Sequence, residues 1–233
     1  MPTKRVTITK SVRSRPSYTM GSRYRKKRSA YRSLRIPVLF GKSRVCRLRY
    51  ALEFNRAITS SSGSYQEIAY LANSCYDPYN PAGGHQPRGF DQMMEMFDHF
   101  LVLGSRIVIK FIAPASTAPN PMCCSIVLND DTTALGSHSD VAESRTVKCK
   151  YLTDSSRALT IGMNFSAKRF FSVDKKALSA KSAISGSALA NPTELAVFHV
   201  GAQCIGTNTQ QVELAGYIDY VVKFHESKLP TIS

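Results

Sequence analysis

The residue types best suited to chemistry lie in one short stretch, N-P-A-G-G-H-Q-P-R-G-F-D-Q, at positions 80–92. His85 could serve there as a general base or as a metal ligand. The carboxylates near enough in sequence to orient its ring are Asp77, Asp91 and Asp98. However, we find no Ser or Cys in a nucleophile elbow and no G-x-x-x-x-G-K-[ST] phosphate loop. We therefore interpret His85 as a hydrogen-bonding turn residue and predict no catalytic residue.

The other histidines and the short acidic run are better explained by ordinary structure than by a metal site. His99, His199 and His225 fall on strand patterns, and His138 lies in a polar segment. The run 129–131, Asn-Asp-Asp, could coordinate a hard cation, but it is also typical of an acidic turn, which is the interpretation we favour. The sequence predicts neither a metal site nor a cofactor.

The cysteines do not follow a zinc or disulfide pattern, because no two of them form a C-x-x-C pair. Two are adjacent and must point to opposite faces of any strand. We expect buried, reduced thiols, which agrees with folding inside a cell. The six residues are Cys46, Cys75, Cys123, Cys124, Cys149 and Cys204.

Excess positive charge is concentrated at the start of the chain. The 233 residues include 31 Lys and Arg against 16 Asp and Glu. Residues 1–50 hold 16 of the basic residues and no acidic one, so residues 51–233 carry 15 basic and 16 acidic residues. Apolar residues are scarce in residues 1–44, so we expect this segment to be disordered on its own and residues 45–233 to form one domain.

The basic segment is suited to binding nucleic acid without sequence preference. Arg and Lys bind phosphates, and the interleaved Tyr18, Tyr24 and Tyr31 offer stacking platforms for unpaired bases. A tail that only aids solubility is the alternative, and it does not explain the complete lack of acidic residues. The predicted nucleic-acid-binding residues are Lys4, Arg5, Lys10, Arg13, Arg15, Arg23, Arg25, Lys26, Lys27, Arg28, Arg32 and Arg35.

Targeting signals in the same segment point to the nucleus. No apolar core of a secretory signal is present, and no apolar run approaches the roughly 20 residues that span a bilayer, so we predict no membrane insertion. A transit peptide would share the Arg and Ser content, but no helical apolar stripe accompanies it. The stretch R-Y-R-K-K-R fits a nuclear localisation patch formed by Arg23, Arg25, Lys26, Lys27 and Arg28.

Alternation with period two dominates the rest of the chain and predicts half-buried strands. Four segments show it clearly, at 44–55, 99–111, 157–165 and 211–225. In the first, Arg47 and Arg49 fall on the polar face. In the second, the expected inward set is Leu101, Leu103, Ile107, Ile109 and Phe111, with Arg106 and Lys110 on the opposite face.

Weaker alternation brings the total to eight strands. It occurs at Tyr65–Leu71, Met122–Leu128, Arg145–Tyr151 and Glu194–Cys204. Only two stretches look helical, Gln92–Asp98 and Lys175–Ile184. Eight strands with long connections and little helix predict an all-β, eight-stranded jelly-roll sandwich behind the basic arm.

Four short motifs follow one another in the central part of the chain. They are Y-D-P at Tyr76–Pro78, G-H-Q-P-R-G-F-D-Q at Gly84–Gln92, D-H at Asp98–His99 and V-x-G-S-R at Val102–Arg106. This block, from 73 to 111, resembles the best-preserved part of capsid proteins from circular Rep-encoding single-stranded DNA viruses, the circovirus-like (CRESS-DNA) group. Met93 and Phe97 depart from the usual aromatic and Tyr residues but keep apolar bulk.

The resemblance implies a jelly-roll coat protein that assembles with its own copies into a small icosahedral T=1 shell of sixty subunits. The basic arm would then bind the packaged single-stranded DNA genome, and the loop at 80–92 would be a scaffold and interface element. Arg88 and Asp91 would hold that loop in one conformation or pair it with a neighbouring subunit. The loop residues singled out are His85, Gln86, Arg88, Phe90 and Asp91.

The same resemblance places the protein in the virion, and in the host nucleus during assembly, with nuclear import factors and a cell-surface receptor as further partners. Two alternatives stay open. One is a monomeric, basic nucleic-acid-binding module, and the other is the coat protein of a small RNA virus, because electrostatics does not separate DNA from RNA. A β-sandwich hydrolase or lectin would need a polar cleft that the sequence does not indicate.

Overall fold

The segments with period-two alternation form antiparallel strands. In the computed structural model, the residues described are 41–52, 56–61, 63–81, 83–114, 121–153, 155–173, 182–206 and 209–228. The strands are β1 (Ser43–Ala51), β2 (Arg56–Ser60), β3 (Tyr65–Leu71), β4 (Phe97–Ile112), β5 (Met122–Asn129), β6 (Val147–Leu152), β7 (Ala158–Ser166), β8 (Gly186–Ser187), β9 (Val197–Cys204) and β10 (Gln210–Ser227). The helices are α1 (Phe90–Met96), α2 (His138–Glu143), α3 (Ala167–Phe170) and the short 3-10 turn η1 (Ser182–Ile184).

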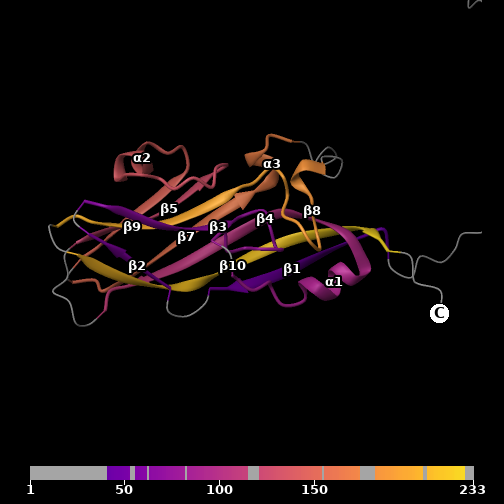
Figure 1. Cartoon of the computed structure of the whole chain (residues 1–233), viewed down its shortest axis with the longest axis horizontal. Coiled ribbons are helices and arrows are strands. Elements are labelled where there is room, and N and C mark those ends of the chain that lie inside the picture. The colour runs from indigo at the N-terminus through magenta and orange to yellow at the C-terminus, as the bar shows by residue number, and fades with distance from the viewer. Residues whose placement is uncertain are drawn as a thin grey trace, which may run out of the picture. The chain divides into compact units, whose positions relative to one another are not determined.

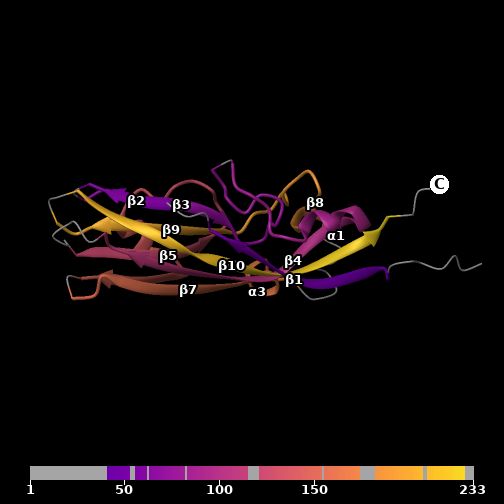
Figure 2. The same ribbon diagram turned by 90° about the horizontal axis from the view of Figure 1, so that it is seen from below.

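The strands form two stacked antiparallel sheets, seen edge-on in Figure 2. A six-stranded sheet has the order β1-β10-β4-β7, with β2 also paired to β10 and β8 to β4. A four-stranded sheet has the order β3-β9-β5-β6. The chain crosses repeatedly between the two sheets, as from β3 to β4, from β4 to β5, from β6 to β7 and from β9 to β10, which is the arrangement of a jelly roll. The predicted eight-stranded jelly roll is therefore confirmed, with β2 and β8 as additional short strands.

The core lies between the two sheets because alternate side chains of each strand point inward. Along β10, buried and more exposed residues alternate over most of the strand, as its sequence pattern predicts. Ile218 pairs with Ile107 across to β4, and both side chains are fully buried. Tyr220 is buried as well, and its hydroxyl donates a hydrogen bond to the carbonyl of Leu71 at 2.7 Å, which links the core to the end of β3.

A β-bulge corrects the predicted inward face of β4. The register between β10 and β4 shifts between Val221 and Val222, so Leu103 has no direct partner on β10. One extra residue reverses the alternation of a strand, because successive side chains point to opposite faces. Before the bulge Phe100 and Val102 are fully buried in the core, whereas Leu103 is only partly buried. Of the expected inward set, Leu101, Ile107, Ile109 and Phe111 are buried as predicted, and Leu103 is the exception.

The helical predictions were partly right. Helix α1 begins two residues before the predicted Gln92–Asp98 and ends at Met96, where β4 takes over. Most of the predicted helix Lys175–Ile184 lies outside the described residues, and its end forms η1. Helices α2 and α3 were not predicted. Figure 1 shows α1 and β8 at one end of the sandwich, and the turn between β2 and β3 at the other.

The thiols are mostly buried, as expected, with one exception. Four cysteines are buried, Cys46 is partly buried, and Cys149 on β6 is exposed. All six are free. Among the residues that the structure describes, no helix is long and apolar enough to span a bilayer.

Candidate nucleic-acid interface

The predicted loop around His85 packs against the first strand of the sandwich. The ring of His85 stacks on Tyr50 of β1, with 4.5 Å between ring centroids and 25° between ring planes. Next to it, a Cβ atom at Gly84 would lie 2.6 Å from the Cβ of Tyr79, so only glycine fits this position. His85 thus packs its ring against β1, whereas the hydrogen-bonding turn role expected from the sequence stays a prediction.

The other singled-out loop residues divide into buried and exposed members. Phe90 is fully buried and meets Phe100 edge to face, with 5.2 Å between centroids. Gln86 is partly buried. Arg88 and Asp91 are both exposed, and within the described part of the chain neither forms an ion pair. An intramolecular Arg88–Asp91 clamp therefore has no support in the fold, whereas a contact to a neighbouring subunit stays a prediction.

The acidic run after β5 forms a turn, as we favoured from the sequence. The carboxylate of Asp131 accepts hydrogen bonds from the backbone nitrogen and the hydroxyl of Thr133, at 3.0 and 2.9 Å. These bonds lower the pKa of Asp131 below its usual value. In the ranges that the structure describes, no group of three or more His, Cys, Asp or Glu is suited to a metal ion.

The twelve cationic residues predicted to bind nucleic acid, and the nuclear localisation patch among them, all lie outside the described residues. The described chain begins just before β1, which starts at Ser43, two residues before the predicted boundary of the domain. The basic segment is therefore joined directly to an outer strand of the six-stranded sheet.

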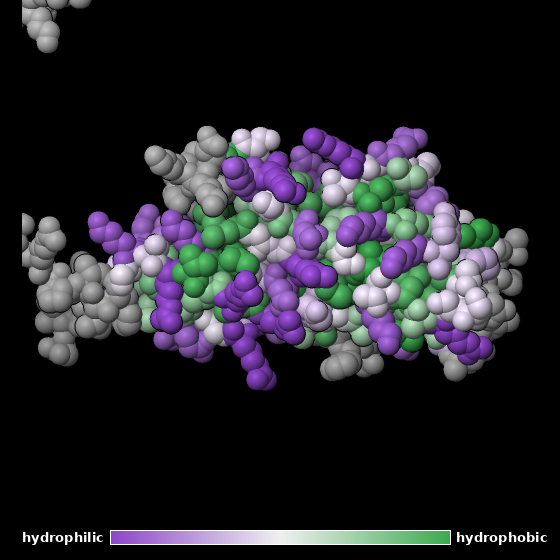
Figure 3. All heavy atoms as spheres, turned by 180° about the vertical axis from the view of Figure 1, so that it is seen from behind, coloured by the Kyte–Doolittle hydropathy of each residue, from purple (hydrophilic) through white to green (hydrophobic). Residues whose placement is uncertain are grey.

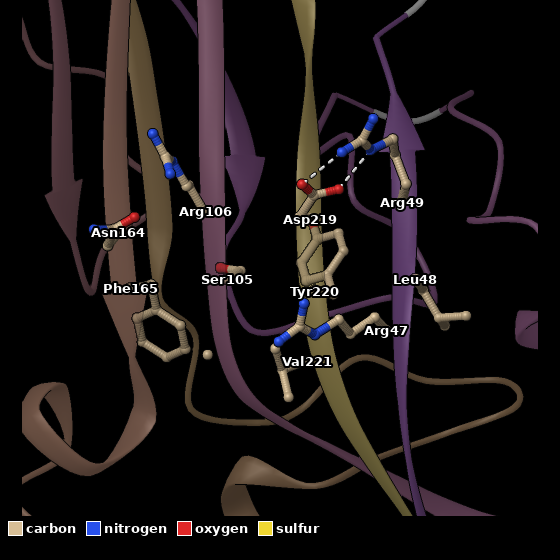
Figure 4. Close-up of a pocket in the computed structure, with 11 residues that line it drawn as sticks. Arg47, Leu48, Arg49, Ser105, Arg106, Asn164, Phe165, Asp219, Tyr220 and Val221 are labelled. Atoms are coloured by element: carbon tan, nitrogen blue, oxygen red, sulfur yellow. Dashed lines mark hydrogen bonds and ion pairs between the residues drawn. The ribbon is translucent and has the colours of Figure 1, made fainter.

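The face of that sheet that points away from the core carries a row of polar residues. Arg49 on β1 is opposite Asp219 on β10, which is opposite Arg106 on β4, which is opposite Asn164 on β7. We call this surface the outer face. An open pocket of about 640 Å³ lies on it, between Arg47 and Arg49 on one side and Arg106 and Asn164 on the other. Figure 4 shows this pocket with its lining residues.

One arginine of the pocket is fixed by an acidic partner. Arg49 donates two hydrogen bonds to Asp219, from Nε to Oδ1 at 2.6 Å and from Nη2 to Oδ2 at 2.8 Å. Its guanidinium also lies 4.0 Å from the ring centroid of Tyr217. The hydrogen bonds to Asp219 raise the pKa of Arg49, and the two-point contact holds the guanidinium in one orientation.

The other two arginines have no such partner. Arg47 and Arg106 are exposed, and neither forms an ion pair or hydrogen bond with another described residue. With three arginines against one aspartate, the pocket carries a formal charge of +2. In Figure 4, Arg47 reaches from β1 toward Val221 on β10, and Arg106 extends from β4 toward β7, where its Nη2 lies close to Gly162. Figure 3 shows the molecule from behind relative to Figure 1. On this face, too, long hydrophilic side chains project between apolar patches.

The sequence pattern had already placed Arg47 and Arg106 on the polar faces of their strands, but we did not predict them as binding residues. The period-two alternation of each strand was visible in the sequence, whereas the proximity of Arg47 to Arg106 was not. It depends on β10 inserting between β1 and β4, which brings residues from the two ends of the chain together.

The chain is similar to known proteins in structure but not in sequence. No family model matches this chain, and no curated protein matches it in sequence. Solved virus structures are similar in fold. One is tobacco necrosis virus, with a TM-score of 0.47 and 14% identity over 83% of this chain and 87% of that one. Another is cocksfoot mottle virus, with a TM-score of 0.45 and 9% identity over 79% of this chain and 94% of that one.

A third similar structure is the decameric BFDV capsid protein, which comes from a circovirus. It has a TM-score of 0.44 and 11% identity over 79% of this chain and 99% of that one. These three structures are therefore virus coats, two from plant RNA viruses and one from a circovirus.

Proposed function

We propose that this protein is a viral capsid subunit, without catalytic activity, that assembles with its own copies and packages nucleic acid. The observation that carries the proposal is the direct connection of residues 1–42, which hold 13 basic and no acidic residues, to the first strand of a jelly roll. Jelly rolls serve as shell subunits, lectin domains and cupins, so the fold alone does not decide among them. The cationic segment favours a role in which the sandwich encloses a polyanion.

The charge of the basic segment matches the scale of a small genome. Sixty copies with sixteen cations each would supply about 960 positive charges, enough to neutralise roughly a kilobase of single strand by simple pairing. The domain itself is nearly neutral, so its copies can pack side by side without strong mutual repulsion. We infer a T=1 shell of sixty subunits from the sequence resemblance.

The same resemblance favours single-stranded DNA as the cargo, with assembly in the host nucleus and import through the patch at 23–28. Nuclear import factors would bind that patch, and a cell-surface receptor would bind the outside of the particle. Of these partners, the nucleic acid depends on the arm because Lys and Arg neutralise its phosphates.

Particle size tests the central proposal. Full-length protein should elute from a size-exclusion column as a megadalton-scale particle, or form one when salt and nucleic acid are adjusted, and electron micrographs should show closed shells. A chain that stays near its monomer mass of 25.8 kDa in every buffer is a monomeric module, which would contradict the proposal. Nuclease digestion and sequencing of the packaged strand separate DNA from RNA cargo.

The loop at 80–92 supplies a prediction for the contact between subunits. Because Arg88 is exposed and bonds nothing within the described chain, Arg88→Ala should leave the melting temperature unchanged but lower particle yield several-fold. Arg88→Lys keeps the charge without the planar fork and should restore yield only in part. Normal particle yield from Arg88→Ala would show that this residue is not an interface residue.

A further inference from the structure

The outer face holds two unpaired arginines on either side of one pocket. In the register of the sheet, Arg47 is opposite Val221, which is opposite Gly104, and Arg106 follows two residues along β4. Two strand spacings across and two residues along place the two Cα atoms roughly 12 Å apart. Between them the pocket wall includes the backbone of Gly104. A Cβ atom at Gly104 would lie 3.0 Å from the carbonyl oxygen of Phe165 on β7, so glycine leaves this part of the pocket wall without a side chain.

The charge of this pocket selects an anionic ligand. Asp219 is already neutralised by Arg49, so it does not compete with a ligand for Arg47 or Arg106. Guanidinium groups bind phosphate oxygens in a planar, bidentate geometry. The amide of Asn164 adds a hydrogen-bonding group that is compatible with any base or sugar. Contact with a second copy of the same face is disfavoured, because it would bring these cations against each other.

The short chain distance between the basic segment and β1 limits how far a ligand bound by that segment can lie from β1. Arg35, the last predicted binding residue of the segment, is eight residues before Ser43, where β1 begins. Eight residues span at most about 29 Å, so a nucleic acid bound at Arg35 is held within about that distance of the start of β1. Arg47 lies on the same strand, four residues further on.

We propose that the outer face between Arg47 and Arg106 binds the phosphate backbone of a single-stranded nucleic acid and so extends the site of the basic segment onto the folded domain. This inference rests on the proposed function and deepens it, because it gives the nucleic acid a defined binding site on the sandwich. We call this site, between Arg47 and Arg106, the seat. Binding there is electrostatic and independent of sequence. The seat would hold part of the nucleic acid in a fixed position relative to each subunit. The basic segment alone would not fix that position.

The salt dependence of binding tests the seat. Full-length wild-type protein and Arg47→Ala/Arg106→Ala are titrated with a fluorescent single-stranded oligothymidine at several salt concentrations. Each phosphate contact contributes about 0.7 to the slope of log K against log salt, so the double variant should lower the magnitude of the slope by about 1.4. Both side chains are exposed and unpaired, so the melting temperature should not change.

A charge-matched control comes from a second pocket. Arg145 and Arg169 are also exposed, have no described partner, and line a neighbouring pocket of about 550 Å³ that shares Asn164 and Phe165 with the first but contains neither Arg47 nor Arg106. Arg145→Ala/Arg169→Ala should leave the slope at the wild-type value. If both double variants reduce the slope equally, the effect is one of net charge, and the seat between Arg47 and Arg106 is refuted.

Other outcomes separate the seat from the proposed function. A wild-type slope in Arg47→Ala/Arg106→Ala refutes the seat and leaves the role of the basic segment intact. Failure of the wild-type protein to bind the oligonucleotide contradicts both proposals. Oligouridine should behave like oligothymidine, because both carry the same phosphates. Loss of binding to heparin, with unchanged binding to the oligonucleotides, would instead assign the face to a sulfated polysaccharide and overturn the inference.

Discussion

His199 on β9 is fully buried, and both of its ring nitrogens face acceptors. Nδ1 lies 2.7 Å from Oε1 of Glu67 on β3, and Nε2 lies 2.8 Å from the carbonyl oxygen of Asp131. Both hydrogen bonds can be donated at once only by the doubly protonated, charged imidazolium. His199 therefore joins three parts of the chain, β9, β3 and the turn after β5, through a buried charged pair.

This geometry gives the fold a pH dependence with a definite sign. Burial by itself lowers the pKa of His199, but the hydrogen bond and charge of Glu67, together with the contact to Asp131, outweigh it and raise the pKa. A raised folded-state pKa means that the stabilisation is present below the ordinary pKa of histidine and is lost as pH rises through the raised value. His225 behaves oppositely, because burial lowers its pKa, so its contribution is lost as pH falls.

Replacing His199 should remove both the pair and its pH dependence. His199→Ala leaves the carboxylate of Glu67 buried without its partner, and we expect a loss of about 3 kcal/mol in the free energy of unfolding at mildly acidic pH. The variant should also lose less stability than the wild type as pH rises above about 6.5, the ordinary pKa of histidine. Urea unfolding at a series of pH values measures both effects.

The double variant His199→Ala/Glu67→Leu serves as the control, since it removes the stranded carboxylate. It should recover part of the lost stability. Equal stability of the single and double variants would show that Glu67 carries no uncompensated charge after the histidine is removed.

At the scale of elements, the two sheets are linked where β6 passes β7. Lys148 and Lys150 on β6 donate hydrogen bonds from Nζ to the carbonyl oxygens of Gly162 and Thr160, at 2.6 and 2.9 Å. In the described fold β7 is the last strand of its sheet, so these carbonyls lie along an open edge. Lysine side chains that occupy an open edge prevent it from pairing with another chain.

Removing the two lysines should expose that edge. Lys148→Ala/Lys150→Ala is expected to lower the free energy of unfolding by about 1 kcal/mol, because the bonds are exposed to solvent. Its larger effect should be faster aggregation, measured by light scattering at constant protein concentration. Lys110→Ala/Lys168→Ala removes the same charge at exposed positions whose side chains form no described hydrogen bond to the carbonyls of β7, and it should aggregate at the wild-type rate. Similar aggregation of the two variants would trace the effect to net charge rather than to the edge.

At the scale of the whole molecule, charge and core are divided between two parts of the chain. Deleting residues 1–40 removes 12 of the 16 basic residues that precede position 51 but leaves β1 complete. The shortened chain should therefore keep the wild-type melting temperature within a few degrees. It should lose most of its retained nucleic acid, measured by the absorbance ratio at 260 and 280 nm of the purified protein.

The deletion also tests the division itself. Unfolding of the shortened chain would show that the basic segment contributes to the hydrophobic core. Undiminished retention of nucleic acid would place the main binding surface on the sandwich. A residual, salt-sensitive affinity is the expected result, because Arg47 and Arg106 remain on the outer face.

Several features of the fold were predictable from local pattern alone. The alternation along β10 and β7 predicted which side chains are buried, because the side-chain period of a strand is fixed by backbone geometry. The bulge in β4 was not predictable, since it depends on how many residues β10 places opposite that stretch. Helix α2 was missed as well: it is only six residues long, and its polar sequence has a single buried side chain, Val141.

The sequence by itself determined the segregation of positive charge, the strand content and the absence of a recognisable catalytic motif, because each depends on composition or on neighbours along the chain. Only the tertiary structure decided which strands are adjacent. Arg49 and Asp219 are 170 residues apart, and their pairing requires β10 to lie beside β1. Strand order follows from how two apolar sheet faces bury each other across the whole domain, so the pocket between Arg47 and Arg106 exists only after folding.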